Sequence, residues 1–313
     1  MRRVLLALAG VIVAAVALPP LWFRLFREPE PELPPPGRRS VLASGVTVNV
    51  VEQGAGSPVV LVHGLPGTAY DWRLTSAALA ARGARALAYD RVGYGWSDPR
   101  PGGAFTVEAN ARELLELLAA EDLRDATVVG WSYGGGTAIV AALRDASRIG
   151  RLVLVGSAGP GIEKGGPPPG ASLLFSDPVL AWLHAVPPLA RGLRASVSAA
   201  AFSGGPEPDW WLPTVDANFA RPGVAQTWRN EMAALTSAPA PDPTGLALPI
   251  LVIHGDHDRL VPVEIGRELA RRAAHAQLEV VLGGSHALPV THAELLADEI
   301  AAFLPGPAAT NAP

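Results

Sequence analysis

Strand-like and helix-like stretches alternate along most of this chain, and this alternation constrains its fold more than any other feature. Short, continuous apolar runs such as PVVLVHG (58–64) and ATVVGWS (126–132) are typical of strands that are buried on both faces. Longer stretches with apolar residues three or four positions apart, such as 106–123, predict helices between them. Strands that alternate with helices predict an α/β fold with a mostly parallel, doubly wound sheet.

The alternation is interrupted in one long segment. Residues 159–245 are rich in proline and glycine and contain only short helix-like pieces, so we expect them to form a helical cap. Residues 40–158 and 246–305 would then form the core, and the Pro-rich residues 28–39 an extended linker before it. A substantial core is possible because 49% of the 313 residues are hydrophobic.

The N-terminal residues 1–27 differ in character from the rest of the chain. Residues 4–23 are twenty positions without a charge, just long enough to cross a bilayer as a helix. We interpret the segment as an uncleaved, single-pass membrane anchor on an otherwise exported protein. A cleaved secretory signal is the alternative, because residues 15–17 have the small-x-small pattern of a cleavage site.

Composition excludes several kinds of chemistry. The chain has no cysteine, so it can form no disulfide, thiolate nucleophile or cysteine metal site. Its net charge of −4, without a basic stripe, gives no reason to expect a nucleic-acid partner. We expect no cofactor and no metal, since Asp256, His257 and Asp258 lie too close along one turn to close a site by themselves.

Ser132 lies where a buried strand passes into a helix, in the sequence VVGWSYGGGT (128–137). A sharp turn there would strain the serine and crowd the residues two positions away, where Gly130 and Gly134 leave room. Its hydroxyl would then be presented at a helix N-terminus, where the dipole favours developing negative charge. The pattern indicates a nucleophile, although a plain glycine-rich helix start would look the same.

A serine nucleophile needs a base, and the base needs a carboxylate that fixes its tautomer. Among the seven histidines, His286 is the candidate because it follows a strand, LEVVLGGS, that runs into a Gly-Gly loop. Asp256 and Asp258 both lie just beyond the preceding strand, in LVIHGDHDRLVP. Spacing alone does not choose between these two carboxylates.

These motifs together resemble the α/β-hydrolase superfamily, in its capped form with a single-domain core. Besides GWSYGG, the resemblance is carried by VLVHGLPG (60–67), DRVGYGWSD (90–98), HGDHDRLVP and GGSHALP, over residues 40 to 304. It implies an α/β-hydrolase fold with a helical cap inserted after the sixth strand.

The resemblance also implies roles for individual residues. It points to Asp258 as the acid, with Asp256 second, and supports His286 as the base. It assigns the oxyanion hole to the backbone N–H groups of Leu65 and Tyr133.

Serine at position 132 disfavours haloalkane dehalogenases and epoxide hydrolases, since the members of the superfamily with those activities have aspartate there. We predict an esterase- or lipase-like serine hydrolase that cleaves carboxylic esters through a Ser132, His286 and Asp258 triad and an acyl-enzyme. The alternatives are a lipase, a hydrolase of carbon–carbon bonds and an aminopeptidase. A non-catalytic binding protein is a less favoured alternative from a different class.

The aromatic residues of the cap suggest an apolar pocket and hence a small apolar ester as substrate. The candidates are Trp182, Trp210, Trp211 and Trp228. An equally good interpretation is that these side chains pack the cap onto the core.

Overall fold

The computed structural model describes residues 16–22, 32–100, 102, 104–160, 179, 182 and 185–305. Among these residues, eight strands form one sheet in the order β1-β2-β4-β3-β5-β6-β7-β8. The strands β1 and β2 and the strands β2 and β4 pair antiparallel, and all other neighbours are parallel. The predicted mostly parallel sheet is therefore confirmed. The strands are β1 (Arg38–Val41), β2 (Thr47–Gln53), β3 (Ser57–Val62), β4 (Ala84–Tyr89), β5 (Ala126–Trp131), β6 (Ile149–Val155), β7 (Ile250–Gly255) and β8 (Ala276–Val281).

The sheet is buried on both faces. In the register of β3 and β5, Val60 is paired with Val128 and Leu61 with Val129. The first pair belongs to one apolar cluster and the second pair to another, because successive side chains of a strand point to opposite faces. This double burial explains why these strands are continuous apolar runs in the sequence.

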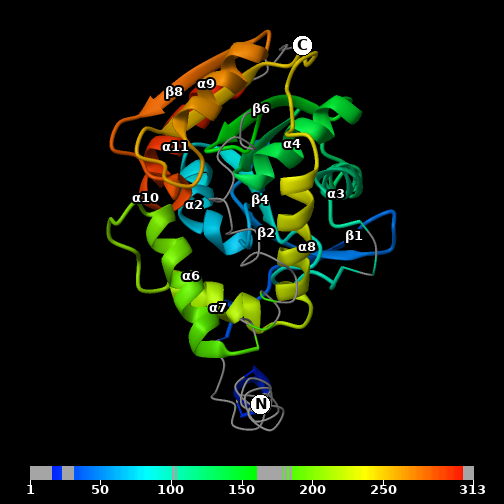
Figure 1. Ribbon diagram of the computed structural model, residues 1–313. Coiled ribbons are helices and arrows are strands. Elements are labelled where there is room, and N and C mark those ends of the chain that lie inside the picture. The colour runs from blue at the N-terminus through cyan, green and yellow to red at the C-terminus, as the bar shows by residue number, and fades with distance from the viewer. Residues whose placement is uncertain are drawn as a thin grey trace, which may run out of the picture.

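Helices cover both faces of the sheet (Figure 1). One face packs against α3 (Val107–Ala120), α4 (Tyr133–Arg144) and α9 (Val263–Arg272). The other face packs against η1 (Ala69–Trp72), α2 (Arg73–Ala81), α10 (Leu288–Thr291) and α11 (Ala293–Phe303). Thr106 caps the helix α3, because its hydroxyl accepts a hydrogen bond from the Ala109 N–H.

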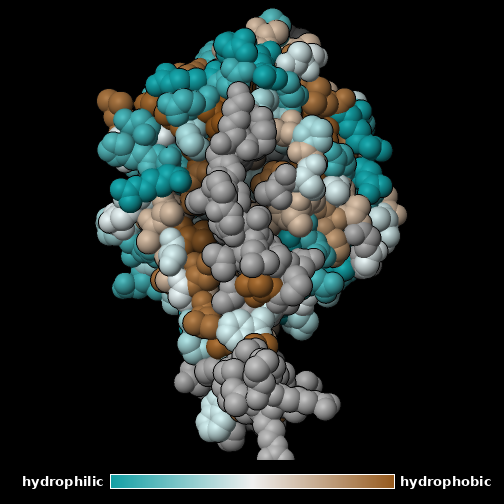
Figure 2. All heavy atoms as spheres, viewed as in Figure 1, coloured by the Kyte–Doolittle hydropathy of each residue, from teal (hydrophilic) through white to brown (hydrophobic). Residues whose placement is uncertain are grey.

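A group of helices is inserted between β6 and β7, as predicted. They are α6 (Pro187–Ala201), α7 (Trp211–Ala220) and α8 (Val224–Ser237). In Figure 1, α6 and α7 lie together in the lower part of the view, and α8 runs up from them on the side of α3. In the same view, Figure 2 shows hydrophilic residues along the sides of this face and hydrophobic residues near α6 and α7.

The edge strand β1 begins at Arg38, two residues inside the predicted linker. Its burial pattern leaves three of its four residues exposed, and Arg38 and Arg39 pair with acidic side chains of neighbouring elements. An exposed edge strand with charged residues lacks the apolar run by which the buried strands can be predicted.

The structure contradicts the predicted membrane anchor. In the part of the chain that the structure describes, no helix is both long and apolar enough to cross a membrane. Of the predicted anchor, the structure describes residues 16–22, which are helical. The remainder of the predicted anchor lies outside the described residues. The membrane partner and the single-pass, exported localisation that we predicted are corrected accordingly.

Candidate active site

Ser132 occupies a strained turn between β5 and α4. Its backbone angles are φ 55° and ψ −120°, a region that side-chain-bearing residues rarely adopt. The strand β6 and the loop after it hold this turn, because the Ser132 N–H donates to the Val155 carbonyl and the Ala158 N–H donates to the Ser132 carbonyl, each at 3.0 Å. The serine is thus fixed by contacts that its own ten-residue motif does not contain.

The neighbouring glycines allow the backbone to approach closely. A Cβ at Gly130 would overlap the backbone of Gly134, and one at Gly134 would overlap the carbonyl oxygen of Val62. A Cβ at Gly64 would lie 3.0 Å from the Cβ of Ser132, so the loop after β3 lies against the serine. The predicted steric role of Gly130 and Gly134 agrees with this geometry.

His286 and Asp258 form a buried pair. The His286 Nδ1 lies 2.6 Å from Asp258 Oδ2, and the other carboxylate oxygen accepts the backbone N–H groups of Leu260 and Val261. Burial alone would raise the pKa of Asp258, but the charge of His286 and these hydrogen bonds hold it well below its usual range. The carboxylate therefore stays ionised and can orient the imidazole ring.

Trp131 and Gly156 bring this pair next to the serine. The Trp131 Nε1–H donates to the His286 carbonyl at 2.8 Å, and the centroids of the Trp131 and His286 rings are 5.5 Å apart. A Cβ at Gly156 would lie 3.2 Å from Asp258 Oδ2 and 3.3 Å from His286 Nδ1. The predicted triad residues Ser132, Asp258 and His286 thus follow the carboxyl ends of β5, β7 and β8, and Gly156 follows β6, which lies between β5 and β7.

The alternative acid, Asp256, has a different partner. Its Oδ1 accepts the Gly283 N–H at 2.7 Å, in the turn that follows β8. Of the two carboxylates that spacing left open, Asp258 is therefore the one that contacts His286.

The loop after β3 holds one predicted oxyanion donor, the Leu65 N–H. The Gly64 carbonyl accepts hydrogen bonds from His63 Nδ1 at 2.8 Å and from Arg91 Nη2 at 3.2 Å. In a trans peptide the C=O and the following N–H point in opposite directions, so these two bonds fix the direction of the Leu65 N–H. The other predicted donor is the N–H of Tyr133, the first residue of α4. The first N–H groups of a helix have no hydrogen-bond acceptor within the helix itself.

His63 supports this loop and is not available as a base. Its Nε2 accepts the Arg91 N–H at 2.9 Å while its Nδ1 donates to Gly64, so both ring nitrogens are engaged in the neutral form. Burial and the Arg91 charge hold the pKa of His63 well below its usual value.

Residues 57–293 match the family described as the alpha/beta hydrolase fold. The chain belongs to the α/β-hydrolase family. The hydrolase is 30% identical to a 2-hydroxymuconate semialdehyde hydrolase of Pseudomonas sp. (strain CF600), over 88% of this chain and 96% of the relative.

Solved structures resemble the hydrolase over a similar length. An esterase from Exiguobacterium antarcticum superposes with a TM-score of 0.70 at 22% identity, covering 86% of this chain and 99% of the esterase. An esterase from Rhodococcus sp. ECU1013 gives a TM-score of 0.66 at 26% identity, with 85% and 98% covered.

The hydrolase has a buried polar network behind the oxyanion loop that our sequence analysis missed. The Arg91 Nη1 lies 3.0 Å from both carboxylate oxygens of Glu231, which also accept the Tyr94 hydroxyl and the Asn110 amide. Burial alone would lower the pKa of Arg91, but the Glu231 charge raises it above its usual value. The motif DRVGYGWSD contains Arg91, whereas nothing in the sequence around Glu231 indicates its partner.

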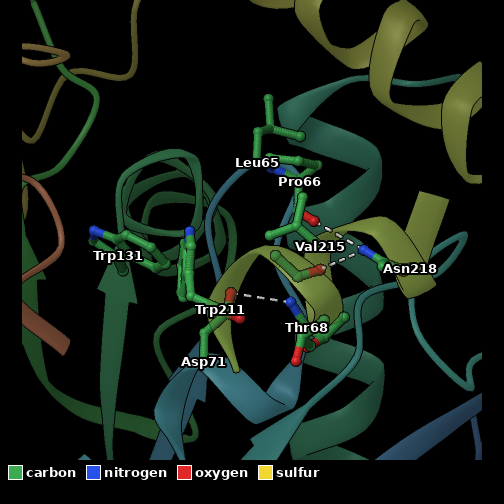
Figure 3. Close-up of a pocket in the computed structure, with 10 residues that line it drawn as sticks. Leu65, Pro66, Thr68, Asp71, Trp131, Trp211, Val215 and Asn218 are labelled. Atoms are coloured by element: carbon green, nitrogen blue, oxygen red, sulfur yellow. Dashed lines mark hydrogen bonds between the residues drawn. The ribbon is translucent and has the colours of Figure 1, made fainter. Parts of the chain in front are cut away.

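A pocket of the hydrolase adjoins the loop after β3 (Figure 3). Its lining combines that loop, η1, the end of β5 and the cap helix α7. The residues are Leu65, Pro66, Gly67, Thr68, Asp71, Trp131, Trp211, Thr214, Val215 and Asn218. Leu65 bears the predicted oxyanion donor and Trp131 precedes Ser132, so the pocket lies next to the proposed reaction centre.

Of the four tryptophans predicted to line a pocket, the structure places Trp211 there. Trp210 packs against Tyr70, and the Arg73 guanidinium lies 3.4 Å from its ring centroid. Trp228 belongs to a separate apolar cluster, and the Trp182 indole donates to the carbonyl of residue 16. Trp210 and Trp228 thus have packing contacts, which was the alternative interpretation for these side chains.

No group of three His, Asp or Glu side chains within the described ranges could hold a metal ion. The carboxylates of the acidic turn at residues 256–258 have other partners. Asp258 contacts His286, and Asp256 accepts the Gly283 N–H.

Proposed function

We propose that this hydrolase cleaves carboxylic esters through an acyl-enzyme on Ser132. The observation that carries the proposal is the 2.6 Å pair of His286 and Asp258 next to a strained serine. Because Nδ1–H donates to Asp258, the other ring nitrogen, Nε2, is left to accept the serine proton.

The reaction then follows from these positions. The Ser132 Oγ attacks the ester carbonyl carbon while its proton passes to His286 Nε2. The tetrahedral intermediate collapses, the alcohol leaves with the proton from His286, and the acyl group stays on Ser132. A water molecule, deprotonated by His286, releases the acid and restores the serine. Asp258 remains ionised throughout and stabilises the imidazolium.

The Leu65 and Tyr133 N–H groups are the proposed donors to the oxyanion. Donors that are already oriented stabilise the charge that develops on the carbonyl oxygen without further rearrangement. The hydrogen bonds from His63 and Arg91 to the Gly64 carbonyl support this role for Leu65.

Hydrolysis of a carbon–carbon bond is the second candidate. It is favoured by the 30% identity to a 2-hydroxymuconate semialdehyde hydrolase over most of both chains. The esterase from Rhodococcus, at 26% identity, supports the ester reading.

Turnover of p-nitrophenyl esters and of 2-hydroxymuconate semialdehyde by the wild type separates the two candidates. Labelling by a fluorophosphonate probe tests the nucleophile. We expect Ser132→Ala to abolish both labelling and turnover, and the exposed-turn control Ser147→Ala to retain them. Undiminished turnover by Ser132→Ala would refute the proposal.

A further inference from the structure

The pocket contains a buried carboxyl group that the proposed reaction does not use. Asp71, in η1, is 4% exposed, and its Oδ2 accepts the Thr68 N–H at 3.1 Å. Within the described ranges its other oxygen has no hydrogen-bond partner. A buried carboxyl group is costly unless it is well paired, so this half-used acid calls for a function.

A buried donor lines the same pocket. Trp211, in the cap helix α7, is 7% exposed, and its Nε1–H has no hydrogen-bond acceptor among the described residues. Its ring packs against Trp131 with the centroids 6.3 Å apart, and in Figure 3 it lies between Trp131 and Asp71. An acceptor and a donor, both unmatched, are therefore presented from the core and from the cap.

The other polar residues of the lining are already satisfied. The Asn218 amide donates to the Pro66 carbonyl at 2.8 Å and accepts the Gly95 N–H at 2.9 Å. The Thr214 hydroxyl donates to the Trp210 carbonyl at 2.7 Å. The Thr68 hydroxyl accepts the Tyr70 N–H at 3.3 Å, and the remaining lining is mostly apolar. We therefore assign the recognition of a polar group to Asp71 and Trp211.

We propose that the substrate of this hydrolase carries a hydroxyl group, which Asp71 and Trp211 bind in this pocket. A hydroxyl both donates, here to the Asp71 carboxyl, and accepts, here from the Trp211 N–H. A carboxylate has no hydrogen to donate to Asp71, and an ammonium group could not accept from the Trp211 N–H. The inference rests on the proposed function, since it names the substrate class of that site, and it replaces the wholly apolar ester expected from the sequence.

The electrostatic surroundings agree with such a role. Burial, supported by the charge of Asp90, raises the pKa of Asp71 to about 7, while the Thr68 N–H and the more distant Arg73 charge oppose the rise. A perturbed carboxyl group in a cleft beside a reaction centre is typical of a functional residue.

A purely structural role for Asp71 has to be separated from recognition, since Asp71 and Thr68 also form a capping box at the start of η1. Asp71→Asn keeps an oxygen that can accept the Thr68 N–H but replaces the free oxygen by a donor. Trp211→Phe keeps the aromatic packing and removes the N–H. Glu279→Gln, on an exposed position of β8, is the matched control.

The experiment compares matched ester pairs that differ by a hydroxyl. They are p-nitrophenyl butyrate and 3-hydroxybutyrate, p-nitrophenyl hexanoate and 6-hydroxyhexanoate, and propyl and 3-hydroxypropyl butyrate. The first two pairs place the hydroxyl on the acyl side, and the third places it on the alcohol side. The readout is the ratio of kcat/KM within each pair.

We expect the wild type and Glu279→Gln to prefer the hydroxylated member of at least one pair. Asp71→Asn and Trp211→Phe should each reduce that preference by about tenfold or more, because each should lower kcat/KM for the hydroxylated member more than for the plain member. The absence of any preference in the wild type, or an equal loss on both members of a pair, would overturn the inference.

Calorimetry that measures the binding of the same ester pairs to Ser132→Ala distinguishes the proposed hydroxyl recognition from the proposed ester hydrolysis. If the wild type turns over no ester, the proposed function fails. A hydroxyl preference in binding that Asp71→Asn removes would still support the pocket, and equal binding of both members would refute it.

Discussion

Arg91 and Glu231 form a buried ion pair between the core and the cap, with the Arg91 Nη1 3.0 Å from both carboxylate oxygens. Their side chains are 1% and 0% exposed. Arg91 follows β4, whereas Glu231 lies in α8, so the pair joins elements far apart in the sequence. Because Arg91 also donates to the Gly64 carbonyl, the cap reaches the oxyanion loop through this contact.

Removing the charge of Glu231 should destabilise the protein and impair catalysis. Glu231→Gln would leave Arg91 buried without a countercharge, and losing one partner of a buried pair costs about 3–5 kcal/mol. Urea denaturation would measure this loss, and ester turnover should show a fall in kcat because the Leu65 N–H is less firmly oriented. The control Glu268→Gln, which removes a partly exposed carboxylate that pairs with Arg271 and Arg272 at the surface, should leave kcat unchanged and lower stability far less than Glu231→Gln does. Unchanged stability in Glu231→Gln would contradict the structure.

The two aspartates after β7 should differ sharply in their effect on rate. Asp258→Asn should lower kcat by about 10⁴-fold, because the amide can no longer hold the His286 tautomer that accepts a proton at Nε2. Asp256→Asn keeps an oxygen that can accept the Gly283 N–H and should leave kcat nearly unchanged. Steady-state kinetics with a p-nitrophenyl ester would decide, and the reverse order would assign the acid to Asp256.

The strain at Ser132 should appear as a difference between two inactive variants. Ser132→Ala keeps a side chain at φ 55°, whereas Ser132→Gly removes the steric conflict. We expect the glycine variant to be more stable than the alanine variant by about 1–3 kcal/mol, as measured by urea denaturation. Equal stability would mean that this turn stores little strain.

Asp71 should make stability depend on pH. Its pKa is raised to about 7 in the folded protein, against an ordinary value of 3.8, so between these values the folded state binds more protons than the unfolded state. The wild type should therefore lose stability relative to Asp71→Asn as pH rises from about 4 to 7, by at most about 1.4 kcal/mol per pH unit. Above pH 7 the difference should level off. Urea midpoints of both proteins across this range would test it, and a constant difference would show that Asp71 titrates normally.

Local patterns in the sequence were sufficient to predict the sheet, the insertion after β6 and the position of the serine turn. A strand buried on both faces must be apolar throughout, and a sharp turn must have small residues two positions away, so both leave marks on adjacent residues. Such marks can also mislead. The apolar run of residues 4–23 predicted a membrane anchor, and the structure contradicts it, since no helix among the described residues is long and apolar enough to cross a membrane.

Tertiary structure alone decided which residues meet. Sequence spacing made Asp256 and Asp258 equally good candidates for the acid, and only the fold places Asp258 against His286. Glu231 and Asp71 looked like ordinary helix residues, because a buried charge acquires its meaning from partners that the chain brings from elsewhere. The sequence by itself determined the α/β architecture and the strained serine, since both depend on neighbours along the chain. The pairing of acid with base, and of cap with core, depends on contacts that exist only once the sheet has assembled.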